Sequence, residues 1–544
     1  MRKAPRLLLM ALLAITVALA GCAGEAPKPA TPAPKPATPA APQVDTKTLT
    51  IGIEFEHAGM DPAVIYDNSS RVIVSIYENL LTLEKVTNKI IAQLAKEWTV
   101  SADGKTYTFK LREGVKFHDG TTLTSEAVKL SLERVVTINR GPAWMFAGSW
   151  TAIETPDPLT VVIKMKKPDA TFLAKLAGPA GPQIISAKAI KDNAGTDNGQ
   201  KYFLEKEAGT GPYMLDKWDR GQQVVLKKFN DYWGGWQGKH VEVVVFKYVK
   251  ESSSQLMLLE KGELDLAPGL PPDTIKDLKT KPKPGIKIEQ GKTQNILSVA
   301  VHCQRGPLKD KRVRQAIAYA IDYDGLLNNV FSNLYEPLLG PLPKDDPNYW
   351  KGAWPYKYDL EKAKQLLKEA GYPNGGFKLK LGLSANSAAF KSVAEVVQEN
   401  LKKLGIEVQI ETLQWGTLYD QEGKPETAFD LMPIGNYPDY ADSSSMLGNQ
   451  FASWAWGANG WNFSFYKNAK VDKMLDDVLL VTDPAKRAQL FQDMQAILVD
   501  EMPLIPIGTR VNNMATRDYV FGYYFRPMMS NSYPVYDMYK EVKK

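Results

Sequence analysis

Residues 106–120 read TYTFKLREGVKFHDG, and their pattern predicts the first structural elements of the chain. Apolar residues occupy every second position from 107 to 111, which predicts a strand with one buried face. A turn dipeptide, Asp103-Gly104, precedes this strand, and the spacing at 124–136 predicts a helix after it. A strand followed by a helix is typical of a mixed α/β protein.

Away from this stretch, strand spacing and helical spacing alternate along the chain. Strand patterns occur at 48–53, 161–165, 224–226, 241–249 and 406–410. Helical patterns occur around 313–321, 359–370, 393–404 and 490–498. Residues 186–210 are rich in Lys, Asn, Asp and Gly, so we expect them to connect two lobes. Helices that lead into strands favour α/β lobes.

Length and composition exclude several classes of protein. The chain has 544 residues, 44% hydrophobic and 24% charged, so two or three lobes are expected. Its 67 basic and 61 acidic residues give a net charge of only +6, which argues against a nucleic-acid partner. Two cysteines and four scattered histidines exclude a disulfide framework and an HExxH metal site.

The first 46 residues are typical of an exported, lipid-anchored protein. Basic residues precede an apolar run at 7–20, too short to span a bilayer, so we interpret residues 1–21 as a signal peptide. The run ends in Leu19-Ala20-Gly21-Cys22, which resembles the lipobox of bacterial lipoproteins, where Cys22 would be lipidated. The Pro/Ala-rich remainder of 22–46 favours an extended stalk.

Catalytic motifs are missing or incomplete. The sequence Gly291-Lys292-Thr293 ends like a phosphate loop but lacks the required glycine five residues earlier, and no GxSxG motif occurs. Cys303 follows His302, but neighbouring side chains on a strand point to opposite faces. We therefore expect a buried thiol beside a surface imidazole. The 61 acidic residues do not single out a catalytic carboxylate pair.

Aromatic residues gather in two polar, glycine-containing stretches. They are Trp144, Phe146 and Trp150 in the first, and Trp454, Trp456, Trp461, Phe463 and Phe465 in the second. Such residues either anchor the core or line a cleft, where they stack on a ligand. The sequence leaves both interpretations open.

Several motifs, in order along the chain, resemble those of the family 5 extracellular solute-binding proteins, the peptide- and nickel-type receptors of ABC importers. These are ENLLTL (78–83), LAKEW (94–98), REGVKFHDG (112–120), GTGPY (209–213), NDYW (230–233), VRQA (313–316) and LGIEV (404–408). The resemblance covers about residues 48–510. It implies an α/β, two-lobed, hinged periplasmic-binding-protein-like fold of the cluster C type, with an extra subdomain in the N-terminal half.

The resemblance also implies boundaries for these parts. Lobe I would comprise 47–72, 205–297 and 506–544, the extra subdomain 73–204, and lobe II 298–505. The chain would therefore cross between the lobes more than once, and the ligand would be enclosed when they close.

The same resemblance implies candidate ligand contacts. In peptide-binding members an Ala-Asp-Tyr-x-x-Pro segment places an aspartate on the ligand's amino group, and Asn436, next to Tyr437, stands at that position here. A neutral amide lacks the charge that an ammonium prefers. Either Asp439 or Asp442 replaces the aspartate, or the ligand has no free amine. Further candidates are Trp415, which matches a tryptophan of the family's cleft, Glu54 and Phe55 after the first strand, and Trp456 of the aromatic stretch.

From this resemblance we expect a monomeric receptor, without cofactor or enzymatic activity, that binds di- or oligopeptides and delivers them to permease and ATPase subunits. It would be held by its lipid anchor on the outer face of the cell membrane or on the periplasmic side. An oligosaccharide or another solute without a free amine is the alternative ligand. Nickel is disfavoured by the few histidines. A secreted hydrolase and a surface adhesin or sensor are the alternatives from other classes.

Overall fold

The computed structural model describes residues 44–65, 70–179, 181–385, 387–457, 460–529 and 532–542. Residues 45–544 form one compact unit. The predicted signal peptide, Cys22 and nearly all of the stalk lie outside the described residues. Within the described ranges, no helix has both the length and the apolar character needed to cross a bilayer.

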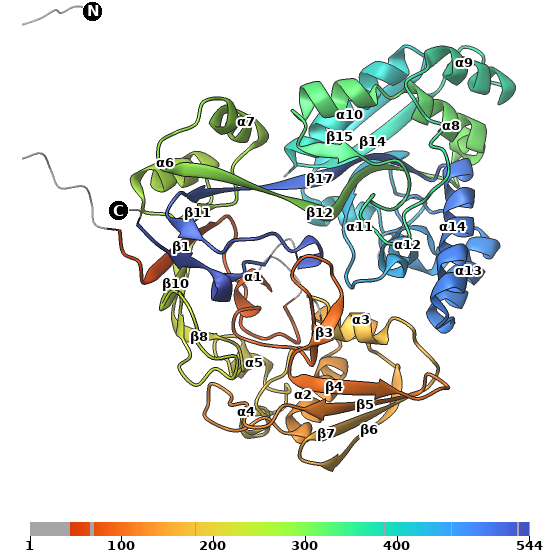
Figure 1. Cartoon of the computed structure of the whole chain (residues 1–544). Coiled ribbons are helices and arrows are strands. Elements are labelled where there is room, and N and C mark those ends of the chain that lie inside the picture. Colours follow the sequence, from red (N-terminus) through yellow and green to blue (C-terminus); the bar gives the residue numbers. More distant parts are fainter. Residues whose placement is uncertain are drawn as a thin grey trace, which may run out of the picture. The chain divides into compact units, whose positions relative to one another are not determined.

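The largest sheet has eleven strands (Figure 1). They are β1 (Thr48–Ile53), β8 (Tyr213–Asp219), β9 (Gln223–Lys228), β10 (Val243–Tyr248), β11 (Leu266–Ala267), β12 (Ile286–Val301), β13 (Tyr335–Pro337), β14 (Lys378–Ser384), β15 (Glu407–Leu413), β16 (Leu431–Asn436) and β17 (Leu504–Arg517). Their order is β15-β14-β16-β12-β17-β11-β1-β10-β9-β8, with β13 paired to β17. The predicted strands at 48–53, 224–226, 241–249 and 406–410 all belong to this sheet.

Two long strands, β12 and β17, join its two halves. They pair antiparallel along most of their length and run side by side between the region of β1 and β11 and the region of β14 and β15 (Figure 1). Their register is irregular between Lys292 and Ile296 and again between Leu297 and Ser298. At one end β17 pairs with β11, and at the other β12 pairs with β16. We refer to this pair of strands as the ribbon.

The N-terminal half contains a separate four-stranded sheet of order β4-β5-β7-β6. Its strands are β4 (Ala95–Val100), β5 (Thr106–Leu111), β6 (Trp150–Asp157) and β7 (Thr160–Met165). Elsewhere, two-stranded sheets are formed by β2 (Leu81–Leu83) with β3 (Ile90–Ala92) and by β18 (Val520–Phe521) with β19 (Tyr539–Lys540). Along β5, Tyr107, Phe109 and Leu111 are buried, as their alternation predicted. The apolar side of α2 (Ser125–Ile138) packs into the same core.

In addition to α2, further α-helices pack against these sheets. The others are α1 (Ser70–Ile73), α3 (Phe172–Ala177), α4 (Ala187–Asn193), α5 (Gln200–Phe203), α6 (Ser252–Lys261), α7 (Pro272–Thr280), α8 (Lys311–Ala320), α9 (Leu360–Glu369), α10 (Ala388–Lys402), α11 (Trp415–Gln421), α12 (Ser443–Phe451), α13 (Ala469–Leu480) and α14 (Pro484–Glu501). Helix α9 begins where expected, because Asp359 accepts a hydrogen bond from the backbone N of Lys362 at 2.8 Å. The predicted mixed α/β class is confirmed.

The segment 186–210, predicted to connect two lobes, is more regular than its composition indicated. It contains α4 and α5. Ser186 caps α4 by accepting a hydrogen bond from the backbone N of Ala189, and Ile190 and Phe203 are buried in the same core as β1. Two well-placed apolar residues anchor these short helices, although polar residues dominate the composition of the segment.

Candidate functional site

Strand β16 ends at Asn436, one of the predicted ligand contacts. Its side chain is buried, and its Oδ1 accepts a hydrogen bond from the backbone N of Tyr437 at 2.8 Å. Tyr437 itself is 49% exposed. Asn436 therefore shapes the end of the strand, whereas the Tyr437 ring is accessible to a solute.

Asp439 lies three residues beyond the end of β16. Its carboxylate Oδ2 accepts a hydrogen bond from the Nδ2 of Asn449 at 2.7 Å, and its backbone N donates to the Oγ of Ser445 at 2.8 Å. Asn449 is a buried residue of α12, and its backbone oxygen also accepts from the backbone N of Trp461 at 3.1 Å. Asn449 thus links Asp439 to the second aromatic stretch, a link that the sequence did not predict.

Asp442 has a structural role. It caps α12 by accepting hydrogen bonds from the backbone N and the Oγ of Ser444, at 2.9 and 2.6 Å. Both carboxylate oxygens also pair with the guanidinium of Arg487, at 2.7 and 2.8 Å. These contacts leave the carboxylate engaged within the protein.

The same loop contacts the N-terminal subdomain. Tyr440 is buried in the core that contains β5 and α3, and the ammonium of Lys175 lies 5.5 Å from the centre of its ring. Nearby, the backbone N of Ala170 donates a hydrogen bond to the backbone oxygen of Leu479 at 2.8 Å. The residues that follow β16 are therefore held between two parts of the structure that are distant in sequence.

Trp415 is the first residue of α11, on the same half as β14 and β15 (Figure 1). Its ring stacks on that of Trp461, with the ring centres 5.9 Å apart and the planes inclined by 19°. Tyr419, one helical turn later, is the next aromatic neighbour at 5.9 Å. Trp415 and Tyr419 are partly buried, and Trp461 is 38% exposed. Aromatic surface is thus available to a ligand at this position.

Glu54 and Phe55 follow β1 and lie around Arg71. An ion pair joins the Arg71 Nη1 to the Glu54 Oε2 at 3.5 Å, and the same nitrogen donates to the Tyr533 hydroxyl at 3.5 Å. The guanidinium lies 6.0 Å from the centre of the Phe55 ring, which is 50% exposed. Burial opposes the charge of Arg71, but Tyr533 and Glu54 outweigh it and raise its pKa. Arg71 was not predicted, because nothing in its local sequence distinguishes it.

Trp456 is held by the fold of its own loop. Its Nε1 donates to the backbone oxygen of Tyr466 at 2.7 Å, and its ring packs edge-on against Phe465 at 5.8 Å. Of the other predicted aromatics, Phe146 is buried in the core of the N-terminal subdomain, whereas Trp144 and Trp454 are exposed. Phe146 thus anchors the core, as one of the two interpretations predicted.

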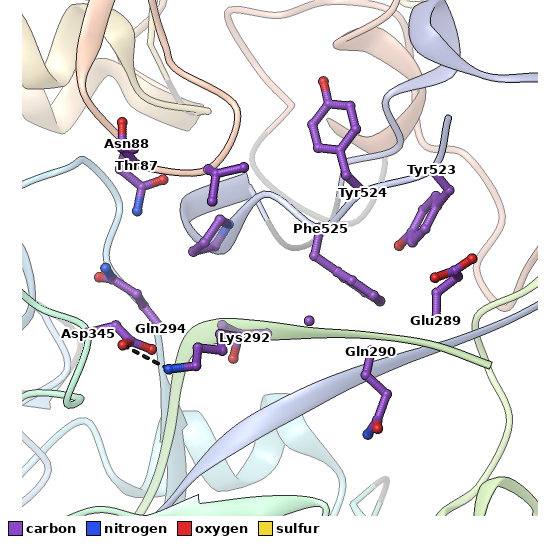
Figure 2. Close-up of a pocket in the computed structure, with 14 residues that line it drawn as sticks. Thr87, Asn88, Glu289, Gln290, Lys292, Gln294, Asp345, Tyr523, Tyr524 and Phe525 are labelled. Carbon is purple, nitrogen blue, oxygen red and sulfur yellow. Dashed lines mark hydrogen bonds and ion pairs between the residues drawn. The ribbon is translucent and has the colours of Figure 1, made fainter. Parts of the chain in front are cut away.

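A pocket of about 560 Å³ lies beside the ribbon (Figure 2). It is lined by Val86, Thr87, Asn88, Glu289, Gln290, Gly291, Lys292, Thr293, Gln294, Asp345, Tyr523, Tyr524, Phe525 and Pro527. The ammonium of Lys292 forms an ion pair with the carboxylate of Asp345 at 3.0 Å. None of the predicted ligand contacts belongs to this lining.

The Cys303 and His302 pair has no catalytic geometry. His302 is buried, which corrects the predicted surface imidazole: its Nε2 lies 2.9 Å from the backbone oxygen of Pro425 and its ring packs on Phe465. Burial lowers the pKa of His302 and raises the pKa of Cys303 to about 11. Cys303 is therefore a thiol and a poor nucleophile. Among the described residues, no group of three or more His, Cys, Asp or Glu could hold a metal ion.

The fold and the candidate site together define a class of protein. The ribbon joins two α/β halves. The candidate ligand contacts are aromatic and charged side chains in both halves, and they lie just after strand ends or at the start of a short helix. Such an arrangement is that of a binding protein with a hinge.

Comparison with known proteins identifies the family. Residues 89–458 match the model of the bacterial extracellular solute-binding proteins, family 5. The probable D,D-dipeptide-binding periplasmic protein DdpA of Escherichia coli K12 is 33% identical over 499 residues, which cover 90% of this chain and 94% of that protein. The glutathione-binding protein GsiB of Pectobacterium atrosepticum is 32% identical over 88% of this chain and 92% of its own length.

A solved structure agrees with this assignment. The ABC transporter-associated periplasmic binding protein DppA of Helicobacter pylori, in complex with the peptide STSA, matches with a TM-score of 0.78 and 27% identity, over 91% of this chain and 98% of that one. The chain belongs to the family 5 extracellular solute-binding proteins. It is a solute receptor of an ABC importer that works outside the cytoplasm with a membrane permease, and it is not an enzyme.

Proposed function

We propose that this receptor captures short peptides and releases them, chemically unchanged, to the permease. The observation that carries the proposal is the position of the Asp439 carboxylate. It accepts a hydrogen bond from Asn449 at 2.7 Å, and Asn449 links it to the second aromatic stretch. A fixed carboxylate suits a peptide's ammonium group, and aromatic rings suit its side chains. The relatives support this ligand class, since they are a probable D,D-dipeptide-binding protein, a glutathione-binding protein and a binding protein in complex with the peptide STSA.

Asp439 replaces Asn436 as the proposed partner of the amino group. The Asp-Tyr pair of the family's Ala-Asp-Tyr-x-x-Pro segment occurs in this chain at Asp439-Tyr440, three residues after Asn436. Asn436 is buried and bonded to its own neighbour, which supports this register. Trp415, Tyr437, Glu54 and Phe55 would contribute the remaining contacts.

The proposed cleft lies between lobe I (47–72, 205–297 and 506–544) and lobe II (298–505), with the subdomain 73–204 on the side of lobe I. The ribbon crosses the proposed boundary, and the irregular register at Leu297 and Ser298 coincides with it. Irregular pairing weakens a strand pair locally and allows it to bend. The lobes would close on a peptide by bending at this point.

Binding of peptides with and without a free amine tests the proposal. The purified chain is titrated in a calorimeter with a mixed-sequence tripeptide library, and then with the tightest-binding peptide in free and N-acetylated form. We expect the free amine to bind at least about tenfold more tightly, and Asp439→Asn to abolish the difference. Asp231→Asn, which removes a surface carboxylate paired with Lys116, is the control. Equal affinity for both forms would instead support a ligand without a free amine.

We also propose that Cys22 is lipidated, that residues 22–46 form a stalk on the membrane surface, and that the receptor is a monomer. The basic start, the apolar run at 7–20 and the lipobox-like end support the anchor. Two acyl chains would suffice for stable attachment. Cys22→Ser should release the protein from the membrane fraction, and a variant that stays attached would contradict the anchor.

A further inference from the structure

Four aromatic side chains beside Trp415 form a closed ring of contacts. Trp415 stacks on Trp461 at 5.9 Å, Trp461 meets Phe463 edge-on at 5.7 Å, Phe463 meets Tyr419 at 6.1 Å, and Tyr419 returns to Trp415 at 5.9 Å. We refer to these residues as the four-ring cluster. Phe463 is only 2% exposed and anchors the cluster in the core.

Trp461 is well placed to determine the orientation of Trp415. The two indole planes are inclined by only 19° with their centres 5.9 Å apart, which is an offset stack in which part of one ring face lies over the other. The backbone N of Trp461 donates a hydrogen bond to the backbone oxygen of Asn449 in α12 at 3.1 Å, and the Trp461 ring contacts Phe463 edge-on. Offset stacking of aromatic rings is directional and fixes their relative planes.

We propose that Trp461 is a positioning residue of the ligand site, which fixes the indole plane of Trp415 by stacking on it. The inference rests on the proposed function in one respect, namely that Trp415 touches the ligand. Without the Trp461 ring, Trp415 keeps Tyr419 as a neighbour but loses the surface that defines its plane. Part of its ordering would then have to be achieved when the ligand binds, which weakens binding.

A double-mutant cycle separates positioning from direct contact. Affinity for the tightest tripeptide of a mixed-sequence library is measured for wild type, Trp461→Ala, Trp415→Ala and the double variant. We expect Trp461→Ala to weaken binding about three- to tenfold in the wild-type chain and to have no further effect once Trp415 is alanine. Trp461→Phe should restore most of the affinity. Trp454→Ala, 56% exposed in the same stretch, is the matched control and should bind as wild type.

A second measurement does not depend on the ligand. Two stacked indoles couple their electronic transitions, so the far-ultraviolet circular dichroism of wild type should contain a paired band that disappears equally in Trp461→Ala and Trp415→Ala. The band should persist in Trp454→Ala, and all variants should keep the thermal midpoint of wild type within a few degrees.

The outcomes are distinguishable. An equal loss of affinity from Trp461→Ala with and without Trp415 would overturn positioning and make Trp461 a direct contact. Loss of affinity in Trp415→Ala but not in Trp461→Ala, or a paired band that survives Trp461→Ala, would also overturn it. If Trp415→Ala binds the peptide as wild type does, the ligand contact in the proposed function fails, and the inference fails with it.

Discussion

The wild-type protein should lose stability as the pH rises, because Glu422 is buried and must then ionise. Replacing Glu422 by glutamine should remove this loss. Glu422 follows α11 directly and is fully buried, and its Oε1 accepts a hydrogen bond from the backbone N of Phe429 at 3.1 Å. Its Oε2 has no hydrogen-bond partner in the described part of the chain. Burial raises the pKa of the Glu422 carboxyl to about 8, against the opposing effects of the Phe429 hydrogen bond and Arg305. The carboxyl is therefore mostly neutral in the folded protein at pH 7.

The size of the effect follows from the two pKa values. An ordinary glutamate titrates near 4.5, whereas folded Glu422 titrates near 8. The folded state therefore binds the proton more tightly, and the stability it contributes is fully present below pH 4.5 and lost as the pH rises through 8. At about 1.4 kcal/mol per pKa unit, the upper bound is roughly 5 kcal/mol, of which about 2 kcal/mol falls between about pH 6 and 7.5.

Urea unfolding at these two pH values measures the effect. Glutamine has the shape of a neutral carboxyl, so the free energy of unfolding of Glu422→Gln, relative to wild type, should rise by about 2 kcal/mol between about pH 6 and 7.5. Glu426→Gln, an exposed neighbour, controls for the loss of one acidic side chain. If the difference between Glu422→Gln and wild type is the same at both pH values, the carboxyl is not held neutral by burial, and the reasoning fails.

Three further predictions concern binding and folding. Trp415→Ala should weaken peptide binding by roughly tenfold in calorimetry with the fold intact, and unchanged affinity would remove Trp415 from the site. Arg134→Ala leaves the buried Asp61 carboxylate without its two 2.7 Å contacts and should cost about 3–5 kcal/mol in urea unfolding, whereas a loss below about 1 kcal/mol would contradict this. Burial opposes the charge of His118, but Glu207 at 2.7 Å outweighs it and raises the pKa, so this pair stabilises the fold below about pH 6.5 and progressively less above it. His118→Gln should flatten that part of the pH dependence, and an unchanged slope would argue against it.

Local patterns in the sequence predicted most of the elements. The alternation at 106–111 became β5, and Asp359 began α9 as expected, because burial and capping act over a few residues. The two short helices at 186–210 were missed because single apolar residues in a polar segment give no detectable period. The burial of His302 was missed because it depends on contacts with Pro425 and Phe465, which are distant in the sequence.

The site was less predictable, because its contacts are long-range. Trp415, Asp439 and Glu54 are candidates that the family resemblance suggested, and the residues that they contact in the fold could not be predicted. Arg71 contacts Tyr533 across 462 residues, and the role of Asn449 depends on how α12 sits against two loops. The spacing of the second aromatic stretch could not show which of Trp456 and Trp461 lies beside Trp415. In the structure Trp456 is hydrogen-bonded within its own loop, and Trp461 stacks on Trp415.

The ribbon also restricts which motions are available. Its two strands are hydrogen-bonded to each other on both sides of the irregular segment, so neither can move without the other. Shear between them would break several of these bonds at once, whereas flexing both together near residues 293–298 keeps them. In the proposed closure the two strands would rotate together about one axis across the pair, and a rigidifying substitution there should slow both capture and release of the solute.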